Sequence, residues 1–97
     1  MDKRRTKIDQ DAERALRTRF YEDIKAGNLS IGQAVKEMRR LSRLTQPEFA
    51  KHRDISLGSL RQIEAGTGNP TVETLEKIGS IFGLEVNFTI RRKTEST

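Results

Sequence analysis

Two adjacent side chains, Arg61 and Gln62, carry hydrogen-bonding groups suited to the edges of nucleic-acid bases. A guanidinium can bond guanine through two parallel hydrogen bonds, and a carboxamide can bond adenine in the same way. The same segment adds Ser59, which could bond a base or a phosphate, and Leu57, which could contact only a thymine methyl group. We therefore expect a base-contacting surface formed by Leu57, Ser59, Arg61 and Gln62.

Catalytic chemistry has few candidates in this chain. The sequence has one histidine, His52, and no cysteine. It also lacks a glycine-rich phosphate loop and a pair of carboxylates at metal-binding spacing. We expect His52 on the solvent side of its helix, as an ordinary surface residue or a neighbour of phosphate. The prediction is a protein that is not an enzyme, with no catalytic residue, no metal site and no cofactor.

Two short helices must position the base-contacting surface. Thr45 can cap the first helix, and Ser56 can cap the second, which ends at Gly66. In the second helix, Leu60 and Ile63 lie on one face and should pack inward. The base-contacting residues then point away from the core, and the tight break between the helices predicts a helix-turn-helix.

The order of apolar, capping and glycine positions resembles the lambda repressor and Cro-like (XRE) family of DNA-binding proteins. The resemblance covers residues 31–84. Its matching residues are Leu44, Thr45, Gln46, Phe49, Ala50, Ile55, Ser56, Leu60, Ile63, Glu64, Gly66, Asn69 and Pro70. Two residues depart from the family pattern, because Arg53 stands where Leu is usual and Asp54 where the turn glycine is usual. Asp tolerates the left-handed conformation better than most residues, so the turn should still form.

The resemblance implies a mainly α fold, in which a five-helix lambda-repressor-like helix-turn-helix domain with one extra N-terminal helix precedes one C-terminal β-strand. In the extra helix, apolar residues recur every fourth position at Ala12, Leu16, Phe20 and Ile24. This stripe must cover either this domain or another chain, and we expect the first. The expected divisions are a disordered basic arm (1–8), the accessory helix (9–28), the helix-turn-helix domain (29–84), a dimerisation strand (85–92) and a disordered tail (93–97).

The resemblance also implies which residues bind the DNA backbone. Gln46 matches a phosphate-contacting position of the family, where free N–H groups at the helix start assist it. Basic side chains and the helix caps surround that position. The predicted phosphate contacts are Arg43, Thr45, Gln46, Lys51, Arg53 and Ser56. Arg39 and Glu64 match positions that often pair in the family, which implies a structural ion pair between the scaffold helix and the recognition helix.

Positive charge is concentrated where the motif lies. The chain has a net charge of +5, and residues 39–61 contain six Lys or Arg against two Asp or Glu. A polyanion such as double-stranded DNA fits this distribution. No apolar run approaches the roughly 18–20 residues of a membrane span, and the basic start lacks the apolar stretch of a signal peptide. We therefore expect a cytoplasmic protein with no membrane partner.

Residues 84–91 alternate between apolar and polar side chains, the period of a half-buried strand. Its apolar positions include Val86, Phe88 and Ile90. No other segment indicates a strand, so the expected partner is the same strand of a second subunit. This arrangement resembles the dimerising β-lid of HipB-like antitoxins and implies a homodimer on a palindromic operator. The alternative is an irregular tail.

Three functions remain to be compared. The favoured hypothesis is the antitoxin of a type II toxin–antitoxin system, which represses its own operon and binds a kinase-like toxin. The second is a stand-alone dimeric repressor of the XRE family without a toxin partner. The third is an RNA-binding or bridging protein, which the scarcity of stacking aromatics disfavours because only four Phe and one Tyr are present.

Overall fold

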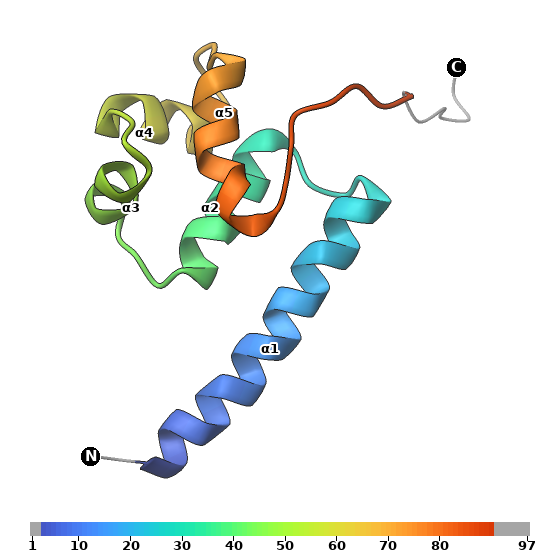
Figure 1. Ribbon diagram of the computed structural model, residues 1–97, viewed down its shortest axis with the longest axis vertical. Helices are drawn as coiled ribbons and strands as arrows, with labels where there is room; N and C mark the ends of the chain where they lie inside the picture. The colour runs from blue at the N-terminus through green and yellow to red at the C-terminus, as the bar shows by residue number, and fades with distance from the viewer. Residues whose placement is uncertain (1–2, 91–97) are drawn as a thin grey trace.

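Five α-helices and a final 3-10 turn form the part of the chain that the computed structural model describes, residues 3–90, with side chains from Gln10 onward (Figure 1). Within these residues there is no β-strand. The elements are α1 (Lys3–Ala26), α2 (Ile31–Leu41), α3 (Gln46–Arg53), α4 (Leu57–Ala65), α5 (Val72–Gly79) and η1 (Ser80–Phe82). None of these helices combines the length and the apolarity needed to cross a membrane.

Side-chain caps set the start of each helix from α2 to α5. In every case a Ser or Thr hydroxyl accepts the backbone N–H three residues later, which satisfies a donor that the helix itself leaves free. The capping residues are Ser30, Thr45, Ser56 and Thr71. In α2 and α3 the contact is reciprocal, because Gln33 and Glu48 accept the N–H of the capping residue. The cap predictions at Thr45 and Ser56 are thus confirmed.

The turn between α3 and α4 forms as expected despite lacking a glycine. Asp54 has φ 58° and ψ 49°, which is the left-handed conformation. Its N–H donates to the carbonyls of Ala50 and Lys51, so it ends α3. At the end of α4, Gly66 takes the same conformation with φ 80°.

A single apolar core lies where the helices meet, and every element contributes to it. Phe49, Leu60 and Ile78 are completely buried. The buried apolar side chains are Phe20, Ala34, Val35, Met38, Phe49, Ala50, Leu60, Ile63, Ile78 and Phe82. The backbones of α2 and α4 approach closely at Gly32, where an added Cβ would lie 2.5 Å from the carbonyl oxygen of Ile63. Only glycine allows that approach.

α1 differs from its prediction in length and in packing. It begins at Lys3, so residues 3–8 are helical and the expected disordered arm is wrong for them; residues 1–2 lie outside the described part. Lys and Arg are good helix formers, and extending an existing helix costs little. The apolar contacts of α1 with the domain come from its C-terminal half. Phe20 is buried, and the Tyr21 hydroxyl donates to the Phe82 carbonyl at 2.8 Å, but Leu16 is 58% exposed.

The C-terminal segment leaves the domain after η1 and Gly83 (Figure 1). Leu84 packs against the core, whereas Phe88 and Ile90 are exposed. The strand expected at residues 85–92 is not formed by residues 85–90, because a strand requires a hydrogen-bonded neighbour and no other described segment provides one. Residues 91–92 and the tail at 93–97 lie outside the described residues.

Candidate nucleic-acid interface

The outer face of α4 presents three residues to solvent. Gly58, Arg61 and Gln62 are exposed, and a Cβ at Gly58 would meet nothing within 4 Å. Leu57 is half-buried and packs against the core, so less of it faces outward than its position indicated. Ser59 is also half-buried. The helix therefore exposes a guanidinium and a carboxamide beside an open glycine.

Hydrogen bonds within the first turn of α4 occupy the two serines. The Ser56 hydroxyl accepts the Ser59 N–H at 3.0 Å and donates to the Ser59 hydroxyl at 2.8 Å. At the other end of the helix, Gln62 lies against Gly68, whose φ is 80°. A Cβ on Gly68 would lie 2.8 Å from the Gln62 Oε1 atom. Gly68 was not among the predicted site residues, and it positions Gln62.

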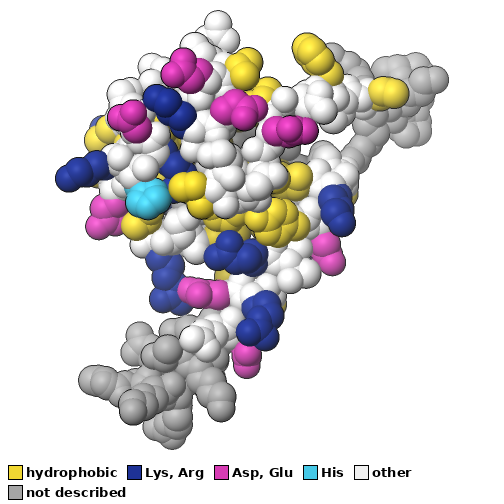
Figure 2. Space-filling view, viewed as in Figure 1, with side chains coloured by type: hydrophobic (Ala, Val, Ile, Leu, Met, Phe, Trp, Pro, Cys, Tyr) yellow, Lys and Arg dark blue, Asp and Glu magenta, His cyan; other side chains and the backbone are white. Residues whose placement is uncertain are grey.

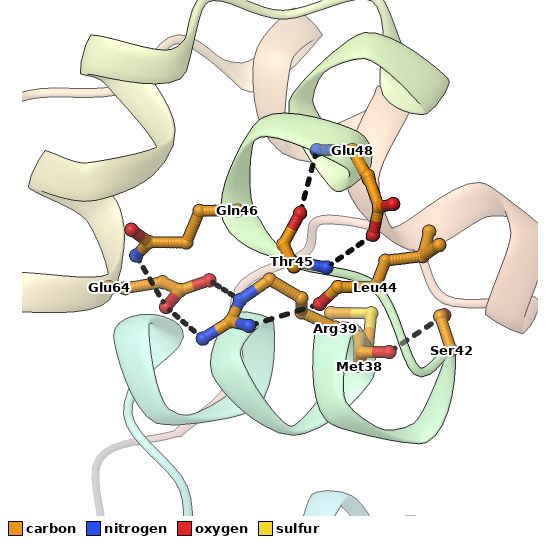
Figure 3. Close-up of polar contacts among 8 residues, drawn as sticks. All are labelled: Met38, Arg39, Ser42, Leu44, Thr45, Gln46, Glu48 and Glu64. Atoms are coloured by element: carbon orange, nitrogen blue, oxygen red, sulfur yellow. Dashed lines mark hydrogen bonds and ion pairs between the residues drawn. The ribbon is translucent and has the colours of Figure 1, made fainter.

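A network of three side chains joins α2, α3 and α4 behind the base-contacting surface (Figure 3). Arg39 donates from Nε to Glu64 Oε2 at 2.8 Å and from Nη2 to Glu64 Oε1 at 3.1 Å. A third bond runs from Arg39 Nη1 to the carbonyl of Leu44 at 3.1 Å. Gln46 donates from Nε2 to Glu64 Oε1 at 3.0 Å. The predicted pair of Arg39 and Glu64 is present, and Gln46 extends it to α3.

The network sets the ionisation of Glu64. Burial alone would raise the pKa of this carboxyl group, whose side chain is only 3% exposed. Hydrogen bonds from Arg39 and Gln46 and the positive charge of Arg39 outweigh burial and hold the pKa of Glu64 below its usual value. Glu64 is therefore a carboxylate at neutral pH, and it orients α4 relative to the scaffold helix.

The sequence of this domain matches a known family over most of the folded core. The family described as helix-turn-helix, HTH_3, matches residues 35–88, more than half of the chain. The chain belongs to this helix-turn-helix family. The immunity repressor protein of Bacillus phage phi105 is 30% identical to it over 66 residues, which cover 68% of this chain and 46% of that protein. The chain thus spans about half the length of that relative. No solved structure matches it.

Of the predicted phosphate-contacting residues of this helix-turn-helix protein, Lys51 is exposed on the last turn of α3. The hydroxyls of Thr45 and Ser56 accept backbone N–H groups as caps. Gln46 has one amide hydrogen on Glu64, which leaves its second amide hydrogen for another acceptor. Lys51 and Gln46 therefore lie at the two ends of α3.

Arg43 binds the accessory helix. Its side chain pairs with the carboxylate of Glu13 in α1, and both are partly exposed. Arg43 also has a positive φ of 60°, in the loop between α2 and α3. The sequence offered no local signal for this contact, because the two residues are far apart in the chain. α1 is thus tied to the loop that leads into the helix-turn-helix.

Arg53 lies inside the domain, so its predicted phosphate contact is wrong. The residue is 5% exposed, its guanidinium stacks 4.3 Å from the Phe49 ring, and Nε donates to the Ile78 carbonyl at 3.2 Å. Burial lowers the pKa of Arg53. The sequence did contain a sign of this burial, because Arg53 stands where Leu, an apolar residue, is usual in the family.

The remaining nitrogens of Arg53 are less well satisfied. Nη1 lies 2.8 Å from His52 Nδ1, and because arginine only donates, a hydrogen bond here has the histidine nitrogen as its acceptor. Nη2 is buried and has no hydrogen-bond partner within the described chain. His52 itself is exposed, as predicted.

The charges of the visible face are mixed. Figure 2 shows Lys and Arg side chains interspersed with Asp and Glu rather than gathered in one patch, with the histidine among them. In the described residues no group of three or more His, Asp or Glu side chains could hold a metal ion. The features that the domain offers to a ligand are helix ends, exposed basic side chains and the outer face of α4.

Proposed function

We propose that this helix-turn-helix protein is a sequence-specific double-stranded DNA-binding repressor of transcription. The observation that carries the proposal is the exposed pair Arg61 and Gln62 on a helix that Ser56 caps and that Glu64 locks to its scaffold. A recognition helix held in this way can enter the major groove with its polar side chains leading. The similarity to a phage immunity repressor supports the repressor function.

In this proposal, Arg61 bonds guanine and Gln62 bonds adenine, each through two hydrogen bonds. Gly58 has open space above its Cα, which lets a sugar or a thymine methyl group approach the helix closely. Ser59 contributes a weaker contact because its hydroxyl already accepts one hydrogen bond. Leu57 contributes only its exposed edge. The polar readout is therefore carried mainly by two side chains.

Backbone contacts come from the ends of α3 and α4. The backbone N–H and the second amide hydrogen of Gln46, at the start of α3, face one phosphate, and Lys51 supplies charge at the other end of that helix. Arg43 joins them when it leaves Glu13 for a phosphate oxygen. The Thr45 hydroxyl adds a contact without giving up its cap, since a hydroxyl accepts and donates at once, whereas the Ser56 hydroxyl must first release its bond to the Ser59 hydroxyl.

Two chains bind together in this proposal, one on each half of a palindromic operator. The segment at residues 84–90 pairs with the same segment of the second chain, which gives hydrogen-bond partners to backbone groups that have no strand beside them among the described residues. A second candidate function adds a toxin partner to the same dimer. The observation that favours it is the exposure of Leu16 on α1, an apolar side chain outside the paired segment that the domain leaves uncovered, although the phage repressor similarity supports repression without a toxin.

The experiment is a selection of binding sites from random duplexes, followed by affinity measurements on the selected site. Arg61→Ala and Gln62→Ala should each weaken that site by about 1–3 kcal/mol and relax the preference at one base pair. Arg19→Ala is the matched control, because Arg19 is an exposed arginine on α1. If neither α4 variant changes the selected sequence, α4 is not the recognition helix. If the wild-type chain selects no sequence, the proposed function is wrong.

A further inference from the structure

An apolar groove lies on the side of the domain where the C-terminal segment crosses α2 and α5. Its volume is about 220 Å³. Side chains from three parts of the chain line it, among them Ile31 and Met38 of α2, Leu75 of α5, and Leu84 and Val86 of the C-terminal segment. A cavity of about 150 Å³ with similar walls holds a benzene ring, so this groove has room for one phenyl group.

The same segment carries a phenyl group that nothing covers. Phe88 follows Val86 by two residues and is 96% exposed, and Ile90 is exposed to the same extent. Figure 2 shows hydrophobic side chains projecting from this C-terminal segment, away from the body of the domain. One chain therefore has an apolar groove and, just beyond it, large apolar side chains that do not fill it.

One hydrogen bond decides which edge of the segment is free. The Val86 N–H donates to Glu76 Oε2 of α5 at 2.8 Å. In an extended chain, the N–H and C=O groups of alternate residues point to opposite edges. The N–H groups of Leu84 and Val86 thus point toward the domain, and in an extended segment the alternation turns those of Glu85, Asn87 and Thr89 outward. The Phe88 N–H bonds the Asn87 side chain. Only the outward edge can pair with another strand.

The free edge fixes a register. If two antiparallel segments are related by a two-fold axis at Asn87, Asn87 of one chain forms a hydrogen-bonded pair with Asn87 of the other. Val86 then lies opposite Phe88 of the second copy, and Leu84 opposite Ile90. Each exposed apolar residue is placed beside a groove-lining one. An axis through residue 86 would leave Ile90 without an apolar residue of the segment opposite it. An axis through residue 88 would do the same to Leu84.

We propose that the groove is the docking site for Phe88 of a second copy of this chain, with a reciprocal contact across a two-fold axis at Asn87. This rests on the proposed pairing of two chains and not on DNA binding. Two Phe88 and two Ile90 side chains, with the surfaces that cover them, bury about 800–1,500 Å². That area reaches the range of stable specific interfaces. The occupant is another copy because the chain carries both the groove and the apolar side chains that fit it, and Phe88 lies outside the groove of its own chain.

Single cysteines test the register, since the chain has none of its own. Asn87→Cys should form a covalent dimer on mild oxidation, because paired residues in a sheet lie about 5.5 Å apart between Cα atoms, within disulfide range. A mixture of Val86→Cys and Phe88→Cys chains should link to each other more than either links to itself. Ile81→Cys is the control, an exposed apolar position outside the groove that should stay unlinked.

Sedimentation of the full chain tests the groove itself. Phe88→Ala should weaken the dimer by roughly 100-fold or more, because each dimer loses two buried rings. Ile31→Glu places a carboxylate at the groove wall and should also give monomers, while the first turn of α2 accommodates an acidic residue. Ile81→Ala should leave the dimer unchanged.

Three results would overturn the proposal. One is a dimer that keeps its affinity when Ile31 or Phe88 is replaced. Another is preferential self-linking of Phe88→Cys, which would put the axis elsewhere. A chain that stays monomeric but still selects a DNA sequence through Arg61 would refute the docking site and leave the proposed function standing.

Discussion

Replacing Arg53 by Leu should raise the free energy of unfolding. The guanidinium is buried, one of its nitrogens has no partner, and burial already opposes its charge. Removing an unsatisfied buried donor recovers about 1–3 kcal/mol, and the burial of Leu replaces the burial of the aliphatic stem of Arg53 without a large net change. Against this, the bond to the Ile78 carbonyl is worth roughly 1.5–3 kcal/mol and the stacking on Phe49 up to about 2 kcal/mol.

Two further effects decide the balance. The desolvation cost of a buried cation that faces no carboxylate is several kcal/mol, and Leu does not incur it. Leu is shorter than Arg, so a small cavity offsets part of that gain. We therefore expect a net stabilisation of about 1–3 kcal/mol.

Urea unfolding followed by circular dichroism measures the change, with the midpoint and the slope reported separately. Lys51→Leu is the control, because Lys51 is exposed on the same helix and its replacement should change stability by less than about 0.5 kcal/mol. DNA affinity should be unchanged in Arg53→Leu, since its guanidinium does not reach the surface. A loss of stability above about 1 kcal/mol would refute this account of Arg53.

Four other outcomes follow from contacts described above. Arg39→Met should lower stability by about 3–5 kcal/mol in urea because it leaves Glu64 buried without its counter-charge, and the double variant with Glu64→Leu should regain most of that loss. Folding lowers the pKa of Glu64, so the carboxylate stabilises the fold above the usual carboxyl pKa of about 4.3. This stabilisation is lost as pH falls through the pKa of the folded state. The free energy of unfolding of Glu64→Gln should therefore fall less steeply with acid than that of the wild-type chain. Gly32→Ala should lower the thermal midpoint, because overpacking costs about 1–3 kcal/mol against a helix-propensity gain of about 1, whereas Gly58→Ala meets no neighbour and should raise it. If a dimer contacts about 6–10 phosphates, its DNA affinity should fall by about 10³–10⁵ between 50 and 200 mM salt, and a flat response would argue against duplex binding.

The local features of the fold could be predicted because each depends on neighbouring residues. A hydroxyl at Ser56 caps the helix that begins one residue later, and Asp54 forms the left-handed turn that its side chain tolerates. The pair of Arg39 and Glu64 lies farther apart in the chain, and the family resemblance supplied it. These three features positioned α3, α4 and the scaffold helix.

The failures concern long side chains and contacts between distant segments. Arg53 was placed on the surface because it is charged, but its aliphatic stem and planar head can cover Phe49 while its Nε reaches a helix-end carbonyl. Arg43 was expected to be available to phosphate, whereas Glu13 of α1 binds it. The apolar stripe of the accessory helix did not show that Leu16 would stay exposed. Periodicity indicates which face of a helix is apolar, but not how far along the helix the rest of the domain covers that face.

The bond between the Tyr21 hydroxyl and the Phe82 carbonyl joins residues 61 positions apart. The contacts among α2, α3 and α4 close much shorter loops, so their ordering costs less chain entropy and should come first on the folding pathway. Docking of α1 then becomes the late step, and its release becomes the lowest-energy partial unfolding of the native state. In hydrogen exchange, amides of α1 should therefore lose protection as a group while those of α2 and α4 remain protected until the whole domain unfolds.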